Sequence, residues 1–191
     1  MTGASATSSI SPLNAFDAAL IKAGIAGCNL VCVSSILPPD AERIENCEIT
    51  PGTITFCVLA RMDGNSGETI GAGLGWAFGV TADDKKYGIV AEAHGYKDGD
   101  VIEKELRWKL QEMARVRQMQ LFNIETRQEC LEVPKGKYGS TIVALVYVPW
   151  SVEEAQRKIS SETLTIQEEL LKLPVKENGY LKLNPKLHVV K

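Results

Sequence analysis

Apolar side chains recur at helical spacing in two stretches of the chain. In residues 12–23 they lie three or four positions apart, Ser11 can cap the start, Pro12 suits the first turn and Gly24 can end the helix. Residues 98–119 repeat this spacing, with polar residues in between. The two stripes are Leu13, Phe16, Leu20 and Ile21, and then Ile102, Leu106, Leu110 and Met113. We predict one helix in each stretch.

Alternating and β-branched residues predict strands elsewhere. The predicted strands cover residues 29–33, 53–61, 69–80, 87–93, 122–133 and 141–148. The first is a short apolar run typical of a buried strand, and the GNSG stretch predicts that the second and third pair as a hairpin. The glycines of the third share one face, which lets another element approach its backbone closely. Two helices and about six strands with mixed connections indicate an α+β layered sandwich.

The two ends of the chain differ from the middle. The first ten residues, MTGASATSSI, are small and polar, and we interpret them as a leader. Residues 11–149 carry the strands and helices and are predicted to form one domain. Residues 150–191 are predicted to form an amphipathic helix up to Pro174, followed by a polar tail.

Composition and charge exclude several classes of partner. Apolar residues make up 45% of the 191 positions and charged residues 24%, which is typical of a globular protein. The formal net charge is −3 and no run of Lys and Arg stands out, so we expect neither nucleic acid nor membrane as a partner. Five cysteines without a C-x-x-C pair, and no visible export signal, predict a reduced, cytoplasmic protein. No His/Cys cluster has ligand spacing, so we expect no metal.

The sequence NLVCVSSILPP contains a candidate for chemistry on the backbone. The hydroxyl of Ser35 can attack the carbonyl carbon of Ser34, which converts the peptide bond into an ester. β-Elimination of that ester, tautomerisation and loss of ammonia to water leave an N-terminal pyruvoyl group at position 35. The reaction needs a tightly held turn and a hydrogen-bond donor for the oxyanion. The alternative is that Ser34 and Ser35 simply end a strand, as other Ser-Ser pairs in the chain carry no such implication.

A longer pattern surrounds this junction. The stretch SPLNAFDAALIKAGIAGCNLVCVSSILPP resembles the processing region of pyruvoyl-dependent arginine decarboxylases, and the resemblance continues through GETIGAGLGWAFG and YGIVAEAHG over residues 11–149. It implies a layered αββα sandwich with mixed or antiparallel sheets, assembled as trimers or hexamers with active sites between subunits. It also implies cleavage between Ser34 and Ser35, with Ser35 becoming the pyruvoyl group and Ser34 the new carboxyl end. Asn29 would assist this cleavage, for example by donating a hydrogen bond to the oxyanion.

The resemblance also implies the residues that act on the substrate. Asp17 would pair with the guanidinium of arginine, and Leu20 would line the same pocket. Glu92 would protonate the substrate carbon after carbon dioxide leaves. From the residues alone, Glu92 lies among small apolar neighbours, where burial favours a carboxylic acid that can donate a proton, although a solvated Glu at a strand edge stays possible. Asp17 alone reads as an exposed helix residue.

The reaction that follows from the resemblance is the conversion of L-arginine to agmatine and carbon dioxide through a Schiff base with the pyruvoyl group. It needs neither pyridoxal phosphate nor a metal. Three alternatives stay open: an uncleaved, non-catalytic relative, a decarboxylase of another amino acid such as histidine, and a hydrolase built on Cys32 or Ser34 with His94.

Two features depart from the family pattern. Many relatives carry a strand before the first helix, and residues 1–10 are too small and polar to supply one. Residues 150–191 extend past the core that resembles the family. We hypothesise that this extension covers the bare sheet edge, replaces the missing strand or mediates assembly.

Overall fold

Two helices and eight strands make up the described part of the computed structural model, which comprises residues 1–39, 41–44 and 47–148. Residues from Met1 to Val148 form one compact unit. The helices are α1 (Pro12–Lys22) and α2 (Gly99–Val116), and the strands are β1 (Thr2–Ser8), β2 (Asn29–Cys32), β3 (Ile36–Leu37), β4 (Ile54–Gly64), β5 (Thr69–Thr81), β6 (Lys86–Gly95), β7 (Met119–Glu132) and β8 (Tyr138–Val146). The helix predicted in residues 150–191 lies outside the described residues.

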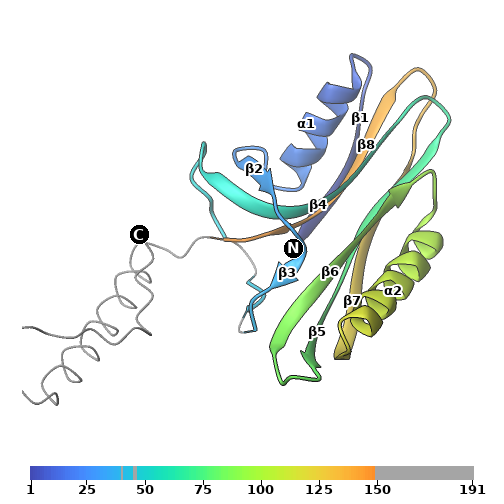
Figure 1. The fold of residues 1–191 in the computed structure, drawn as a ribbon. Coiled ribbons are helices and arrows are strands. Elements are labelled where there is room, and N and C mark those ends of the chain that lie inside the picture. The colour runs from blue at the N-terminus through green and yellow to red at the C-terminus, as the bar shows by residue number, and fades with distance from the viewer. Residues whose placement is uncertain (40, 45–46, 149–191) are drawn as a thin grey trace, which may run out of the picture. The chain divides into compact units, whose positions relative to one another are not determined.

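The strands form two four-stranded sheets. Sheet A has the order β1-β8-β4-β2 and is mixed, because β2 runs parallel to β4 while the other pairs are antiparallel. Sheet B has the order β3-β6-β5-β7 and is antiparallel throughout. Helix α1 packs on sheet A and α2 packs on sheet B, with the two sheets stacked between them (Figure 1). The predicted α+β class with αββα layers is confirmed.

Helix α1 begins and ends where the sequence predicts. The Ser11 side chain accepts a hydrogen bond from the Asn14 amide, and Pro12 occupies the first turn. Ala15 and Ala19 are fully buried, and their small side chains bring the helix close to sheet A. The α1 cluster on that face includes Ile25, Ile142 and Ala144.

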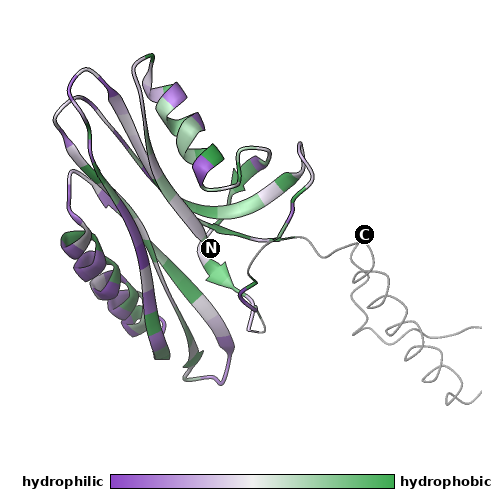
Figure 2. Cartoon of the chain, turned by 180° about the vertical axis from the view of Figure 1, so that it is seen from behind, coloured by the Kyte–Doolittle hydropathy of each residue, from purple (hydrophilic) through white to green (hydrophobic). Residues whose placement is uncertain are grey.

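Helix α2 packs against the glycine face of β5. A Cβ added to Gly73 would lie 2.6 Å from Ile102, and one added to Gly75 would lie 3.1 Å from Leu110. Any side chain on this face would therefore push the helix away from the sheet. The predicted close approach of another element to these glycines is confirmed. Figure 2 shows α2 as a mainly hydrophilic helix with hydrophobic bands, as expected for a helix with one buried side.

The opposite face of β5 points into the space between the sheets. There its apolar residues pack against sheet A and against Leu37 of β3. The buried members of this cluster are Leu37, Val58, Ala60, Ala72, Leu74, Val90 and Val143. This core fixes the separation of the two sheets. Between β2 and β3 the chain crosses from sheet A to sheet B.

The expectation that residues 1–10 supply no strand is wrong. Residues 2–8 form β1, which pairs with β8 through seven consecutive residue pairs. Backbone pairing does not require apolar side chains. Here small polar side chains add a contact between the two strands, because the hydroxyls of Ser5 and Thr141 form a hydrogen bond at 3.0 Å. A Cβ on Gly3 would lie 3.0 Å from Glu129 Cγ. Because glycine has no side chain, the side chain of Glu129 can pack against the backbone of β1 at this position. The sheet edge that the extension was expected to cover is therefore already occupied by β1.

The predicted hairpin of residues 53–61 and 69–80 is also wrong. Strand β4 belongs to sheet A and β5 to sheet B, so the turn after Gly64 carries the chain between layers. Each strand has a strongly apolar face, and burying both faces against each other stabilises a stack more than edge pairing would. The loop is held by backbone bonds to Val133 instead.

Strand β2 forms as predicted but is not buried. Within the described residues it lies at the edge of sheet A and pairs only with β4, and Val31 is 40% exposed. Ile54 and Phe56 of the adjacent β4 are also exposed, as is Ile36 of β3, which follows β2 in the chain. Exposed apolar side chains of this kind are typical of an interface with another protein chain.

Candidate active site

Ser34 and Ser35 lie where the chain leaves sheet A and enters sheet B. Strand β2 ends at Cys32, and β3 begins at Ile36 and pairs with β6. The Val33 amide donates to the Cys57 carbonyl on β4, which anchors the approach to the two serines. The structure describes the uncleaved chain, in which the peptide bond between Ser34 and Ser35 is intact.

The hydroxyl of Ser35 meets Glu92, a residue 57 positions further along the chain. Ser35 Oγ donates to Glu92 Oε1 over 3.3 Å. Glu92 is half-buried on β6, directly opposite Leu74 of β5, and therefore shares the face that points between the sheets. The predicted nucleophile and the predicted acid are thus brought together by the pairing of β3 with β6.

The backbone around the two serines is also hydrogen bonded. The Ile36 amide donates to the Ser34 carbonyl over 2.9 Å, and the Val90 amide of β6 donates to the Ser35 carbonyl over 3.0 Å. The first of these bonds spans only two residues, which defines a γ-turn centred on Ser35. The carbonyl of the bond to be cleaved therefore already accepts a hydrogen bond.

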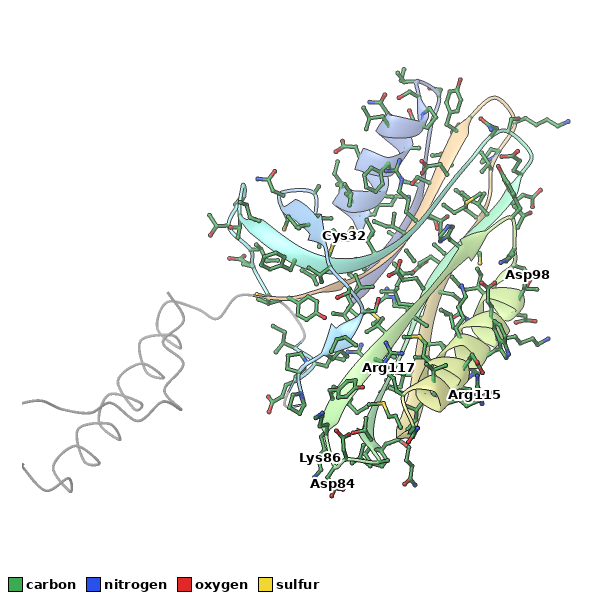
Figure 3. The ribbon with its side chains drawn as sticks, in the orientation of Figure 1. Cys32, Asp84, Lys86, Asp98, Arg115 and Arg117 are labelled. Carbon is green, nitrogen blue, oxygen red and sulfur yellow. The ribbon has the colours of Figure 1, made fainter. Side chains whose placement is uncertain are left out.

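A cavity of about 420 Å³ adjoins this pair. It is lined by Ser35, by residues 90–92 of β6 and by the C-terminal half of α2, including Trp108, Lys109 and Met113. Arg117, which follows α2, also lines it, and Figure 3 shows this residue between α2 and β6. The volume is sufficient for an amino acid. The lining combines apolar side chains with the charged residues Glu92, Lys109, Glu112 and Arg117.

Lys109 is one of the residues of this site that could not be predicted from the sequence. Its Nζ donates to the Glu92 carbonyl over 2.8 Å and forms an ion pair with Glu105 at 2.7 Å. Within the described residues, Val90 is the last residue of β6 whose backbone bonds to the segment around β3, so the lysine satisfies a carbonyl on the open strand edge that follows. Its position on the flank of α2 could be inferred from helical spacing, but the carbonyl it binds depends on the packing of α2 against β6.

Asn29 lies at the start of β2, away from the bond that it was predicted to help cleave. Its Nδ2 donates to the Gly52 carbonyl over 2.8 Å, and its backbone amide donates to Thr53. Three strand steps separate it from Cys32, a distance of about 10 Å. Within this chain Asn29 therefore holds the loop before β4 against the start of β2.

Asp17 and Leu20 lie on α1, on the outer face of sheet A. Leu20 packs in the α1 cluster and is half-buried, and Asp17 is exposed. Glu92 faces sheet A from the other side. Within one chain, sheet A therefore lies between the two predicted substrate-binding residues and the Ser35–Glu92 pair.

The alternative nucleophile Cys32 lies beside Cys57 and, within the described residues, not beside a histidine, which a cysteine hydrolase requires as a base. It lies in register with Cys57 on β4, and burial, reinforced by Cys32, raises the pKa of the Cys57 thiol to about 12 (Figure 3 labels Cys32). All five cysteines are free. His94 is exposed on β6 of sheet B. The structure does not bring Cys32 and His94 together as a catalytic pair.

The family model for pyruvoyl-dependent arginine decarboxylases matches residues 1–152. This chain belongs to that family. The family's dependence on a pyruvoyl group implies such a prosthetic group and an amino-acid substrate here. In the described part of the chain, no helix is both long and apolar enough to span a bilayer.

Individual relatives agree with this family assignment. A pyruvoyl-dependent arginine decarboxylase of Methanopyrus kandleri is 35% identical over 136 residues, covering 71% of this chain and 86% of that protein. Pyruvoyl-dependent arginine decarboxylase 1 of Archaeoglobus fulgidus is 44% identical, covering 47% and 59%. A probable pyruvoyl-dependent arginine decarboxylase of Chlorobium limicola is 45% identical, covering 46% and 50%. For the latter two, the match therefore spans between one half and three fifths of the relative.

The structure of a pyruvoyl-dependent histidine decarboxylase at pH 8 superimposes on this family member with a TM-score of 0.43. The sequences are 12% identical, and the match covers 55% of this chain and 54% of that one. A score this low does not establish a shared fold, so the assignment rests on the family match.

Proposed function

We propose that this chain cleaves itself between Ser34 and Ser35 and then decarboxylates L-arginine to agmatine, with the pyruvoyl group at position 35 and Glu92 as the proton donor. The observation that carries the proposal is the hydrogen bond from Ser35 Oγ to Glu92 Oε1, next to a cavity of about 420 Å³. Neither a hydrolase built on Cys32 or Ser34 nor an uncleaved binding subunit would need a half-buried carboxylate beside Ser35. The family match supports the decarboxylase over both alternatives.

The residues around position 35 suit the group that the family requires. The Val90 amide holds the Ser35 carbonyl, Glu92 lies beside the side chain, and the cavity opens next to both. A pyruvoyl group supplies a ketone conjugated to an amide carbonyl, which accepts the electron pair left when carbon dioxide departs. The protein's own task is to hold that carbonyl, to admit the substrate and to deliver one proton.

Glu92 can act in both the cleavage and the decarboxylation. In the uncleaved chain its carboxylate accepts the hydrogen bond from Ser35 Oγ, so it can take the proton as the oxygen attacks. In the cleaved enzyme the same carboxyl group, protonated, can deliver a proton to the substrate carbon that has lost carbon dioxide. The contact between Lys109 and the Glu92 carbonyl fixes this segment of β6 during both steps.

The substrate site is proposed to form between subunits of a homo-oligomer, a trimer or a hexamer. Asp17 and Leu20 lie on the far side of sheet A from Glu92, so one chain alone does not supply both halves of the site. A second subunit could place its α1 against the exposed region beside the two serines. The exposed Val31, Ile36 and Phe56 give such an interface apolar surface to bury.

The specificity for arginine is tested by measuring carbon dioxide release from arginine, histidine, lysine and ornithine with the full-length protein. We expect arginine to give a kcat/KM at least about tenfold above that of the others, because only a guanidinium forms two parallel hydrogen bonds with one carboxylate. Intact mass recorded on the same sample reports the cleaved fraction. Turnover of histidine in preference to arginine by fully cleaved protein would contradict the substrate and leave the chemistry standing.

Substitution Asp17→Asn tests the proposed contact with the guanidinium. We expect KM for arginine to rise about 10- to 100-fold, the effect of losing one charge-assisted hydrogen-bonded pair, with a smaller change in kcat. Asp100→Asn, on an exposed residue in the first turn of α2, is the matched control. Native mass spectrometry verifies that both variants keep the wild-type assembly. An unchanged KM in Asp17→Asn would remove this residue from the substrate site.

A further inference from the structure

The carbonyl oxygen that becomes negatively charged during self-cleavage already has a donor from the backbone. Attack by Ser35 Oγ places the charge on the Ser34 carbonyl oxygen, and the Ile36 amide donates to that oxygen over 2.9 Å. Ser35 is not among the residues with positive φ, so the turn is of the inverse γ type. Asn29, the donor expected from the sequence, is instead bonded to Gly52.

Each carbonyl of this turn accepts a hydrogen bond from a different part of the molecule. Ser34 is bonded to Ile36, Ser35 is bonded to Val90 of β6, and Ile36 accepts from the hydroxyl of Tyr147 over 2.7 Å. An inverse γ-turn is closed by a single short-range hydrogen bond, so contacts from other elements decide how firmly it is held. The Tyr147 contact is the only one of the three that a side chain makes.

Tyr147 is well placed to fix the turn. It follows β8, and its backbone amide donates to the Phe56 carbonyl over 2.9 Å, which anchors it to the centre of sheet A. Burial raises the pKa of the Tyr147 hydroxyl, so this group stays protonated and available as a donor. Its hydroxyl reaches Ile36, the residue that carries the amide facing the scissile carbonyl.

We propose that the Ile36 backbone amide stabilises the oxyanion of self-cleavage, and that Tyr147 is the positioning residue that holds this amide in place through the Ile36 carbonyl. The step rests on the proposed cleavage at Ser34–Ser35. Ser35 Oγ bonds to the Ser34 carbonyl carbon, and its proton passes to Glu92. The carbon–nitrogen bond then breaks, and the nitrogen of Ser35 takes up the proton, which yields the ester and a free amine. The Ile36 amide is needed while the oxygen carries the negative charge, and no further reactant enters.

Tyr147→Phe removes the hydroxyl and keeps the ring. The uncleaved precursor of each protein is prepared by rapid cell-free synthesis at low temperature, and cleavage is followed by intact mass after warming. We expect the rate constant for cleavage to fall about five- to tenfold, the effect of losing one hydrogen bond that orients a reacting group. Tyr138→Phe, at the opposite end of β8 and without a side-chain hydrogen bond in the described residues, is the matched control and keeps the wild-type rate.

Two further measurements separate positioning from a general loss of structure. The cleaved fraction of Tyr147→Phe keeps wild-type kcat, because the Ser34 carbonyl is no longer attached to position 35, and the thermal unfolding midpoint of the precursor does not change. Hydroxylamine, which cuts the ester intermediate, does not restore the wild-type rate, because formation of the ester is the slowed step.

Three results would overturn the proposal: cleavage of Tyr147→Phe at the wild-type rate, slower cleavage that parallels a lower unfolding midpoint and a lower kcat, or restoration of the rate by hydroxylamine. Failure of the wild-type chain to cleave would instead contradict the proposed function, and it is recognised before any variant is compared.

Discussion

Replacing Ser35 with alanine is expected to leave every chain as one piece of 191 residues and to abolish decarboxylation. Alanine has no hydroxyl to attack the Ser34 carbonyl, so neither the ester nor the group derived from it can form. The loss is complete because no other side chain of the protein supplies a ketone. Intact mass spectrometry and release of labelled carbon dioxide from arginine measure the two effects on the same sample.

Ser9→Ala is the control for the serine substitution. Ser9 is exposed and belongs to another Ser-Ser pair, so this variant should cleave and turn over arginine like the wild type. If Ser35→Ala still yielded fragments ending at residue 34, or decarboxylated arginine as an intact chain, position 35 would not be the origin of the prosthetic group.

Glu92→Gln is expected to lower kcat for arginine by about 10²- to 10⁴-fold, the usual contribution of a positioned proton donor. Glutamine has nearly the same size and can still meet Ser35 Oγ, but it neither accepts the hydroxyl proton nor delivers one to the substrate carbon. Cleavage should be slower for the same reason. The rate must therefore be expressed per cleaved chain, with the cleaved fraction taken from intact mass.

Glu103→Gln provides the matched control on α2. Glu103 forms a surface ion pair with Arg107 and takes no part in the cavity, so its loss should change kcat by less than about twofold. A Glu92→Gln enzyme that was fully cleaved and kept more than about one tenth of the wild-type kcat would assign the proton transfer to another group.

Periodicity predicted the positions of both helices, but it predicted the buried side only of α2: in α1, Leu13 and Ile21 of the predicted stripe are exposed, and the buried side is formed by Ala15 and Ala19. The stripe of α2 ends up buried at Ile102, Leu106 and Leu110, and the glycine face of β5 that receives it was also visible in the sequence. The caps Ser11 and Asp98 mark the starts of both helices within one residue. These features are local, and local patterns encode them.

The errors concern partners that lie far apart in the chain. Strand β1 was missed because its stability comes from backbone pairing with β8 and from contacts of small residues, which leave no apolar alternation to detect. The turn after Gly64 is compatible with a hairpin and with a crossing between sheets, and only the stacking of Val58 against Leu74 decides between them. The exposure of β2 depends on which strands flank it, which its own residues do not specify.

The candidate site shows the same division. Ser35 and Glu92 were named through the resemblance to a family, while their contact arises from the pairing of β3 with β6. The proposed oxyanion donor could not be found in a pattern of side chains, because it is a backbone amide. Lys109 and Tyr147 were overlooked for a related reason: each binds a carbonyl group, and every residue has one.

The order of strands in sheet A has a consequence for the enzyme after the proposed cleavage. Residues 1–34 would form a separate polypeptide that contributes β1 at one edge of the sheet and β2 at the other, with α1 lying across the strands between them. The short chain could leave only if both edges opened together, so dissociation should be slow. Once the short chain had dissociated, it could return only in a bimolecular step whose yield depends on concentration. Only the uncleaved precursor can therefore assemble this sheet within a single molecule.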